Sequence, residues 1–583
     1  MSQQRRIGQE TEYAVRRPGA SNYHASSTKK PSNHSLFLLI RGFISDNCRC
    51  LPGYRDYYQS QFFAENGSAF AYEALPTAEK DGLIEGATAE CSTPHELLCQ
   101  QRAQEAWLKK ALASHQVQAD QAFQGCGLLK NCRDAEGHIY GSQENYEAEI
   151  GSPFWLLLYR AVICLAVPVT FLATIAIIAV ALCILFSIGL IGLFSGGVSF
   201  IFSLLARMLP VKPLSHISQT LSGLNERAIA NVTSIDEEQA SKLANATLFP
   251  ILFILLSPIA WLVSQITFRK VRRGITGFLI TRSIISGAGS LISEGNFVLS
   301  EKGSALSSIK RNWATMASRS IFDSGNLLKG VHLAALDCFV MRRHNWLFLL
   351  NRKQRIQIGC SDANRCDVSE YLKIGTTQLV IEMAESGHLK KAPYPRSTIA
   401  AATAINQDPS LKAQVKTRGG RLATAITIQR WYQKQAQIFV ALDPVSRAHF
   451  QPLIDRWKQV IDTLEWDPEQ LIGQVDWITK KSLLEGSGAG QSFTIKKRID
   501  LGYHELGSGY FEHFANANLV TRLVTDEEIE QALTQAPSTR SAQLRSRFIR
   551  SNHSATKPWI IAWDYATTGL FRNQSRRVFN RTS

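Results

Sequence analysis

The stretch GCSDANRCDVSEYLKIGTTQLVIEMAESG (Gly359–Gly387) is the most informative segment of this chain. A polar start followed by an almost continuous apolar run predicts a long helix over its second half. Ser361 or Asp362 is expected to cap the start of that helix, with Glu370 inside it. Gly375-Thr376-Thr377 interrupts the apolar run. From spacing alone, the segment is interpreted as a buried helix in which Gly375 permits a close packing contact.

The residues of this segment also resemble those of the Pup–protein ligase and Pup deamidase/depupylase family. In that family the corresponding segment reads roughly GD(S/A)N…YLK(V/L)GTTALVL. These enzymes belong to the glutamine-synthetase-like carboxylate–amine ligases. The resemblance implies an α+β fold, with an antiparallel sheet, helices and a small C-terminal domain. It extends over the chain in order, except for an inserted segment and parts of Ser21–Glu65, and several ordered motifs are more specific than one.

The first predicted strand is RRIGQETEYAVRR (Arg5–Arg17), in which Glu10 and Glu12 point to the same side because strand side chains alternate. Such a pair is unfavourable unless a cation lies between the two carboxylates or the edge is solvated. The stretch is similar to the family strand that carries magnesium ligands. The resemblance therefore implies that Glu10 and Glu12 bind Mg²⁺.

Asn66-Gly67 predicts a hairpin turn, whereas Ser21–Glu65 is polar and is expected to be a variable excursion with few helices or strands. The hairpin resembles the family's, which implies Glu85 as a further metal ligand and Thr88 at the nucleotide. Glu73 takes the place of the family's catalytic aspartate. This hairpin differs from that of the family at two positions. Ala69 replaces an ATP-binding arginine, and Ala71 replaces a metal-binding tyrosine. Tyr72 cannot substitute, since a shift of one residue moves a side chain to the other face.

Two glutamines stand where the family has histidines. Leu128–Ile150 resembles a family hairpin in which Gln143 replaces a metal-binding histidine, and an amide oxygen can still bind a hard cation. Arg352–Cys360 resembles a strand in which Gln357 replaces a histidine and Arg355 is implied to contact phosphate.

Two further features lie outside these strands. Trp563 is implied to stack on adenine, although a core tryptophan is the alternative. Ser318–Gly330 lacks the charged signature that the family carries at this place.

Two long apolar runs interrupt the resemblance. Ala161–Ala206 has no charged residue, and Ala246–Phe268 is also apolar. Each exceeds the roughly 20 residues that cross a bilayer. We predict an inserted α-helical transmembrane unit with helices at about 161–188 and 246–268, and Gly189–Phe202 as a hinge or interfacial portion. The number of crossings must be even, because the resemblance resumes afterwards within one domain.

The charges that flank these runs predict an orientation. The cluster Arg269, Lys270, Arg272 and Arg273 follows the second run directly, whereas the loop Arg207–Asn245 carries balanced charge. The positive-inside rule then places the catalytic part in the cytoplasm and the loop outside. The chain is therefore predicted to be a multi-pass protein of the cytoplasmic (inner) membrane.

These boundaries predict four parts. Residues 1–150 form the first part of the catalytic domain, 151–274 the transmembrane insertion, 275–495 the second catalytic part and 496–583 the small C-terminal domain.

Composition restricts the partners. The net charge of +16 fits anionic lipid, an acidic protein or nucleic acid, but no zinc finger, RNP motif or long basic run supports nucleic acid. Eleven scattered cysteines without a C-x-x-C pair indicate reduced cytoplasmic thiols. Met1–Gly19 is polar and charged, so no signal peptide is expected at this end.

The function implied by the resemblance is an ATP- and Mg²⁺-dependent ligase anchored in the membrane. It would join the C-terminal glutamate of a small Pup-like or ubiquitin-like tag to lysines of target proteins through an isopeptide bond. Two alternatives stay open. One is a deamidase or de-tagging isopeptidase of the same system, and the other is a membrane scaffold that binds the tag with little chemistry.

Overall fold

The computed structural model describes residues 5–17, 32–54, 59–75, 78–176, 179, 183, 186, 258–259, 261–263, 265–303, 331, 346–555, 558–568 and 575–579. The chain divides into two compact units. The first combines Met1–Gly151, Phe268–Gly325 and Arg352–Ser583, and the second combines Ser152–Thr267 with Asn326–Asn351. The four-part division expected from the sequence stays a prediction.

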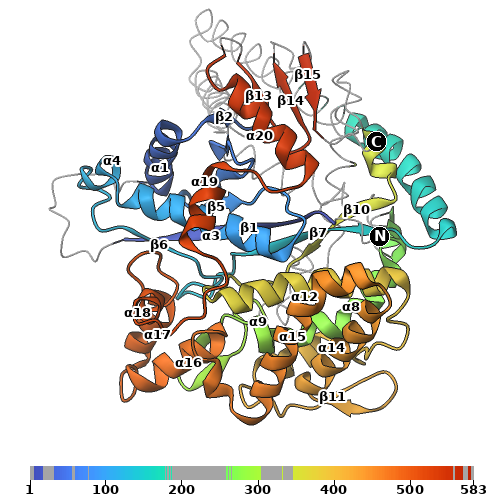
Figure 1. The fold of residues 1–583 in the computed structure, drawn as a ribbon. Coiled ribbons are helices and arrows are strands. Elements are labelled where there is room, and N and C mark those ends of the chain that lie inside the picture. The colour runs from blue at the N-terminus through green and yellow to red at the C-terminus, as the bar shows by residue number, and fades with distance from the viewer. Residues whose placement is uncertain are drawn as a thin grey trace, which may run out of the picture. The chain divides into compact units, whose positions relative to one another are not determined.

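An antiparallel sheet runs through the first unit (Figure 1). Its strand order is β10 (Lys353–Ile358), β7 (Gln143–Glu149), β1 (Ile7–Arg16), β5 (Ala78–Ala87), β4 (Ala69–Leu75), β3 (Phe62–Ala64) and β2 (Cys50–Pro52). β6 (Gly127–Leu129) pairs with β1 beside β7. The antiparallel sheet expected from the sequence is confirmed. Within Leu128–Ile150, an antiparallel bridge joins Arg133 to Ile139 in a short hairpin, whereas β6 and β7 each pair with β1.

Helices cover the face of the sheet to which the odd-numbered residues of β1 point. Gln101 on α3 (Pro94–Leu112) donates to the Tyr13 hydroxyl at 3.2 Å, and Tyr146 of β7 donates to the Ile374 carbonyl of α12 (Asp367–Ser386) at 3.4 Å. Figure 1 shows α12 and α9 (Ser283–Ser286) along the same side of β1 and β7. Glu10 and Glu12 therefore face away from these helices.

The remaining helices and strands of the first unit surround this core. The helices are α1 (Asn33–Asn47), α4 (His115–Gln118), α8 (Arg269–Thr281), α13 (Thr398–Asn406), α14 (Ala425–Ala441), α15 (Pro444–Trp466), η3 (Pro468–Leu471), α16 (Asp476–Gly486), α17 (Phe493–Gly502), α18 (Tyr510–Asn516), α19 (Asp526–Thr534) and α20 (Arg540–Asn552). The strands are β8 (Ser290–Ser293), β9 (Asn296–Val298), β11 (Val415–Lys416), β12 (Leu422–Ala423), β13 (Ile560–Ile561), β14 (Tyr565–Thr568) and β15 (Ser575–Val578).

Helix α12 confirms the long helix of the decisive segment but begins later than expected. Its N-cap is Cys366, and neither Ser361 nor Asp362 caps it. Asp362 instead accepts backbone N–H bonds from Ala288 at 2.8 Å and from Glu301 and Lys302 at 3.1 Å, and so ties the segment to the β9 region. A Cβ at Gly375 would lie 2.6 Å from Leu453 Cδ1, so the glycine serves close helix packing.

The prediction that Ser21–Glu65 has few helices or strands is wrong. Helix α1 begins after Ser32, whose hydroxyl accepts the N–H of Ser35 at 3.0 Å. Its buried side chains pack against strand residues of the sheet, in a cluster that includes Leu36, Phe37, Ile40, Ile44, Phe62, Tyr72 and Ile84. The apolar residues of α1 recur on one helical face, and this local pattern outweighs the polarity of the longer stretch.

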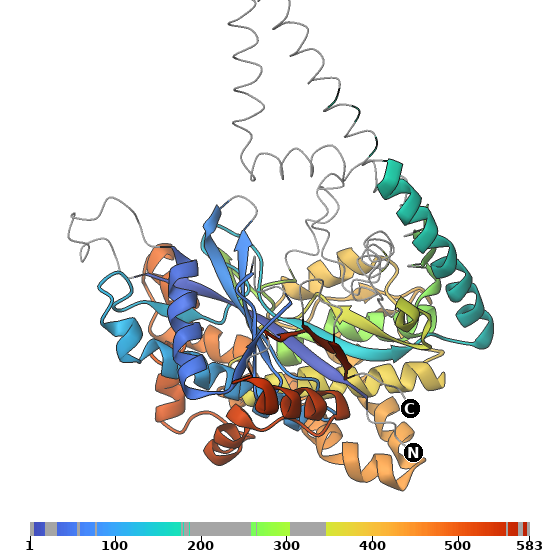
Figure 2. The same cartoon turned by 90° about the horizontal axis from the view of Figure 1, so that it is seen from above.

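The C-terminal elements pack on the other face of the sheet. Phe63, Ala69 and Ala87 of the sheet form an apolar cluster with residues of α20, β13 and β14: Ile549, Ile561 and Ala566. Figure 2 shows these red elements lying over the blue strands. They cover one end of the face that carries Glu10 and Glu12.

Among the described residues of the second unit, one helix, Pro153–Ala176, is long and apolar enough to cross a membrane by length and composition. The most apolar 18 residues of this helix have a mean hydropathy of 2.2, and 33% of them are buried. The Tyr159 hydroxyl donates to the Leu349 carbonyl of the short helix η2 (Trp346–Leu350) at 2.8 Å.

One such helix is weak support for a transmembrane unit, because core helices of soluble proteins have similar lengths and compositions. The segments Gly189–Phe202, Arg207–Asn245 and Ser318–Gly330, and most of Ala246–Phe268, lie outside the described residues. The transmembrane insertion stays a prediction.

Candidate active site

The sheet brings most of the predicted site residues onto one face. Glu12 of β1 lies opposite Glu85 of β5, and Glu10 lies opposite Gln143 of β7. Directly opposed residues share a face, as do residues two apart on a strand. Ala71 of β4 lies opposite Glu85, which places Glu73, two residues further, on this face too. We call Glu10, Glu12, Glu85 and Gln143 the carboxylate row.

Glu12 and Glu85 are the buried members of this row, each 8% exposed. Glu12 Oε2 accepts the backbone N–H of Gly141 at 2.6 Å. Two ionised carboxylates that face each other with little water repel, and a cation between them removes this cost. All four side chains of the row offer oxygen atoms, which hard divalent cations prefer, so the donor set fits Mg²⁺.

Arg355 lies at the edge of the carboxylate row. Its Nη2 donates to Glu10 Oε1 at 3.0 Å and its Nε donates to Asn145 Oδ1 at 2.8 Å. Its side chain is still 42% exposed, so the guanidinium can also meet an anion from solvent. This position fits the phosphate contact that the sequence predicts, although no described contact tests that role.

Gln143 and Gln357, where the resemblance implies histidines in the family, contact each other. Gln357 Nε2 donates to Gln143 Oε1 from the neighbouring strand β10. The amide of Gln143 is thereby held with its oxygen toward β10. A carbonyl oxygen has two lone pairs, so a cation can use the second one.

Ala69 and Ala71 leave small side chains on this face. Ala71 of β4 lies opposite Glu85 of β5, and Ala69 packs in the apolar cluster with the C-terminal elements. Tyr72 points to the opposite face, where it is 2% exposed and its hydroxyl accepts the Gly82 N–H at 2.7 Å. The structure thus agrees with the expectation that Tyr72 does not replace the missing tyrosine.

Glu73 and Thr88 differ in how the structure places them. Glu73 is half-buried on the carboxylate face, next to a register shift between Glu73 and Leu75. Thr88 is 4% exposed, and its hydroxyl accepts the backbone N–H of Gln9 at 3.0 Å. This hydrogen bond ties Thr88 to the β1 backbone and not to the carboxylate row. The nucleotide role of Thr88 stays a prediction.

Trp563 lies beside a buried arginine that the sequence does not single out. The Trp563 ring makes an edge contact with Phe63 at 4.9 Å between centroids, and the Arg545 guanidinium lies 4.7 Å from the Trp563 ring centre. Arg545 Nη1 donates to the Trp563 carbonyl at 2.7 Å, and Nε donates to the Gly67 carbonyl at 3.0 Å. Arg545 thus fixes Trp563 against the β3–β4 turn.

Glu90 is the ion-pair partner of Arg545. Burial raises the pKa of this carboxyl, but the guanidinium outweighs burial and the net shift is downward. Helix α20 contains several arginines, so its sequence carries no signal that distinguishes Arg545 from its exposed neighbours.

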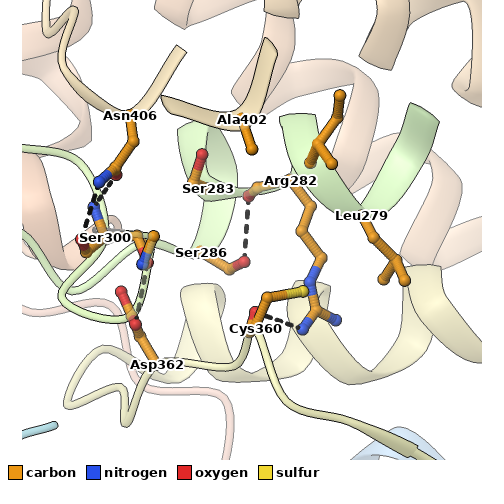
Figure 3. Close-up of a pocket in the computed structure, with 12 residues that line it drawn as sticks. Leu279, Arg282, Ser283, Ser286, Ser300, Cys360, Asp362, Ala402 and Asn406 are labelled. Carbon is orange, nitrogen blue, oxygen red and sulfur yellow. Dashed lines mark hydrogen bonds between the residues drawn. The ribbon is translucent and has the colours of Figure 1, made fainter. Parts of the chain in front are cut away.

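A small cavity lies on the opposite side of the sheet, against α8, α9 and α13 (Figure 3). Its volume is about 30 Å³, enough for a water molecule. Arg282 at its wall binds Glu144 Oε2 at 2.9 Å and Thr377 Oγ1 at 2.7 Å. None of the predicted site residues lines this cavity, so it belongs to the supporting core.

Comparisons with known proteins agree with this fold. A family model described as "Pup-ligase protein" matches residues 5–567. The chain is 27% identical over 312 residues to the Pup–protein ligase of Mycolicibacterium smegmatis, covering 51% of this chain and 63% of the relative. It is 31% identical over 323 residues to the Pup–protein ligase of Corynebacterium diphtheriae, covering 52% of this chain and 62% of the relative. The chain thus spans under two thirds of these curated relatives.

Solved structures share the fold at low sequence identity. A crystal structure of the complex between the prokaryotic ubiquitin-like protein Pup and its ligase PafA has a TM-score of 0.62 and 18% identity, covering 100% of this chain and 90% of that one. A structure of the Pup ligase PafA in complex with ADP has a TM-score of 0.58 and 17% identity, covering 97% and 95%.

Proposed function

The chain belongs to the Pup-ligase family, and we propose that it is an ATP-dependent ligase that attaches a Pup-like or ubiquitin-like tag to protein lysines. The bond would be an isopeptide bond between the C-terminal glutamate of the tag and a lysine amine. The observation that carries this proposal is the opposed pair Glu12 and Glu85, buried on a face that also presents Glu10, Gln143 and Arg355. Two solved structures with this fold are of the Pup ligase PafA, one in complex with Pup and one in complex with ADP. They support a Pup-like tag and a nucleotide as the substrates.

The chemistry proceeds in two transfers. The tag carboxylate attacks the γ-phosphorus of ATP, which gives an acyl phosphate and releases ADP. The lysine amine then attacks the acyl carbon, the amide bond forms, and inorganic phosphate leaves. Mg²⁺, held by the carboxylate row, would neutralise the phosphate oxygens. Glu73 accepts a proton from the lysine ammonium, which gives the free amine that attacks the acyl carbon. Arg355 binds phosphate oxygens, and Trp563 packs against the adenine.

Conjugation with purified components tests the proposal. The full chain is incubated with a tag ending in glutamate, ATP, Mg²⁺ and a lysine-rich protein. We expect ATP-dependent conjugates and one ADP for each bond formed. Release of ammonia from a tag ending in glutamine, or of free tag from a conjugate, would instead assign the chain to the hydrolytic branch. ADP formation without conjugates would remove the ligase proposal.

A tag-binding scaffold is the second candidate, and specific substitutions favour it. Ala69 and Ala71 contribute no charge or hydroxyl, and Gln143 and Gln357 are engaged with each other. Calorimetry distinguishes the two candidates. Tag binding without any ATP binding would support the scaffold, whereas ATP binding that strengthens with Mg²⁺ would support the ligase.

We also propose that the protein is anchored in the cytoplasmic membrane with its catalytic part in the cytoplasm. The apolar helix Pro153–Ala176, the apolar run Ala246–Phe268 and the basic cluster that follows this run support the anchor. Membrane lipid would then be a partner of the second unit. Fractionation of cells expressing the full chain tests this, with the anchor rejected if the protein leaves the membrane pellet in high salt or at alkaline pH.

A further inference from the structure

Helices α3 and α19 present a group of potential metal ligands away from the carboxylate row. His95 and Cys99 are four residues apart near the start of α3, so they share one side of that helix. Glu528 reaches them from the first turn of α19, which packs along α3. His95 Nε2 lies 2.8 Å from Glu528 Oε1, and the ligand atoms of the three residues all lie within 4.8 Å of one another.

The three side chains suit zinc in both chemistry and spacing. Imidazole nitrogen, thiolate sulfur and carboxylate oxygen are its usual protein ligands, with bond lengths of about 2.0 to 2.3 Å. In a tetrahedral site such bonds place the ligand atoms about 3.3 to 3.5 Å apart. At present His95 Nε2 and Glu528 Oε1 are closer than that, at 2.8 Å, because they share a hydrogen bond. The fourth position would be left to water, as at many zinc sites with three protein ligands.

The charges around Cys99 favour a cation. The Cys99 thiol is partly buried and lies near the carboxylates of Glu528 and Asp367. A divalent ion would reverse the repulsion from those carboxylates and stabilise the thiolate. Asp367 Oδ1 is paired with Arg102 Nε at 2.8 Å, so Asp367 adds negative charge near Cys99 but is not a ligand.

The group is preorganised but still accessible. Glu528 Oε2 accepts the Thr525 N–H at 2.8 Å in the capping box of α19, which fixes the carboxylate and leaves Oε1 toward His95. The side chains of His95 and Glu528 are 45% and 39% exposed, so an ion can enter from solvent. Cys99 closes the inner side of the group.

We propose that His95, Cys99 and Glu528 form a zinc site that joins α3 to α19. On binding, Cys99 releases its proton to solvent, and Zn–S, Zn–N and Zn–O bonds replace the His95–Glu528 hydrogen bond. No electron transfer is involved. Because Gln101 of α3 contacts Tyr13 of β1, the ion would connect the C-terminal part of the chain to the helix that supports the catalytic sheet.

The test measures the metal content of the full-length protein after chelation, reloading with Zn²⁺ and gel filtration. An excess of Mg²⁺ without nucleotide keeps Zn²⁺ from the carboxylate row. We expect one tightly held zinc per chain. Co²⁺ substitution should give the thiolate-to-cobalt absorption band of a cobalt–cysteine bond. Cys99→Ser should remove this band and His95→Gln should lower zinc retention at least tenfold.

Two matched variants control for other sites. Cys126→Ser removes a buried thiol outside the group. His138→Asn disrupts the exposed group of Asp134, Glu136 and His138, the other such group among the described residues. Both should retain the zinc and the cobalt band. Circular dichroism checks that each variant is folded. The proposal is overturned if folded wild-type protein retains no zinc, or if Cys99→Ser retains it as wild type does.

Discussion

Glu12 and Glu85 lie directly opposite each other across β1 and β5, and each is only 8% exposed. Two ionised carboxylates at opposed positions of a poorly hydrated face repel each other, and a divalent cation bound by both offsets this repulsion. The proposed magnesium site depends on this pair. Substituting one of the two residues should therefore change both Mg²⁺ binding and the stability of the metal-free protein.

Glu12→Gln should weaken Mg²⁺ binding at least tenfold while leaving the metal-free protein as stable as wild type or more stable. The substitution removes one of two repelling charges, and the glutamine oxygen can still accept the Gly141 N–H. Thermal unfolding with and without Mg²⁺-ATP measures both effects. Glu136→Gln, at an exposed position, is the control and should change neither Mg²⁺ binding nor the stability of the metal-free protein. An undiminished ligand-induced increase in Tm in Glu12→Gln would disprove the metal assignment.

Glu73→Gln should keep ATP binding and lose about 10²- to 10⁴-fold in turnover, because only the proton-accepting group is removed. Glu73→Asp retains a carboxylate, one methylene shorter, and should keep measurable turnover. Single-turnover conjugation and calorimetry separate chemistry from binding. If Glu73→Gln turns over nearly as fast as wild type, another group is the base.

Gln143 allows a test in both directions. Gln143→Ala removes an oxygen from the carboxylate row and should raise the Kd for Mg²⁺, whereas Gln143→Glu replaces the amide oxygen by a carboxylate and should lower it. Gln357→Ala removes only the donor that orients the Gln143 amide and should have a smaller effect than Gln143→Ala. Equal Kd values for Mg²⁺ in Gln143→Ala and wild type would exclude Gln143 as a ligand.

The stability of the protein should fall as the pH rises toward 7 because of Glu382 on α12. Burial raises the pKa of Glu382 to about 7 from 4.5, although Arg5 Nε at 3.8 Å opposes the shift. Between these two values the folded protein holds a proton that the unfolded chain has lost, so raising the pH through this range destabilises the fold. Full ionisation of Glu382 costs about 3 kcal/mol by this shift.

Glu382→Gln tests this expectation, because glutamine does not titrate. The free energy of unfolding of this variant, measured by urea denaturation, should depend less on pH between 4.5 and 7 than that of wild type. Glu136→Gln, which removes an exposed carboxylate, should keep the wild-type slope. If wild type and Glu382→Gln show parallel pH profiles, Glu382 is already ionised in the folded protein below pH 7.

Thiol labelling in intact cells tests the proposed membrane topology. In a background without the native exposed cysteines, Ser234→Cys lies in the loop predicted to be outside and should react with a membrane-impermeant maleimide. Ser551→Cys, at an exposed position of α20, should react only after lysis. Protection of Ser234→Cys would mean that the apolar runs do not cross. Labelling of both positions in intact cells would show that the catalytic unit does not lie in the cytoplasm.

The sequence alone was sufficient for the family, the antiparallel sheet and the alternation that puts Glu10 and Glu12 on one face, because strand periodicity and ordered motifs are local properties. It also indicated the long helix α12. It could not determine that β6 and β7 both pair with β1, nor that α1 is part of the core, because partners distant in the chain decide these features. Only the tertiary structure placed Glu85 opposite Glu12, joined Gln357 to Gln143, and brought Arg545 onto Trp563. These contacts depend on register and burial, which arise when segments separated by many residues pack together.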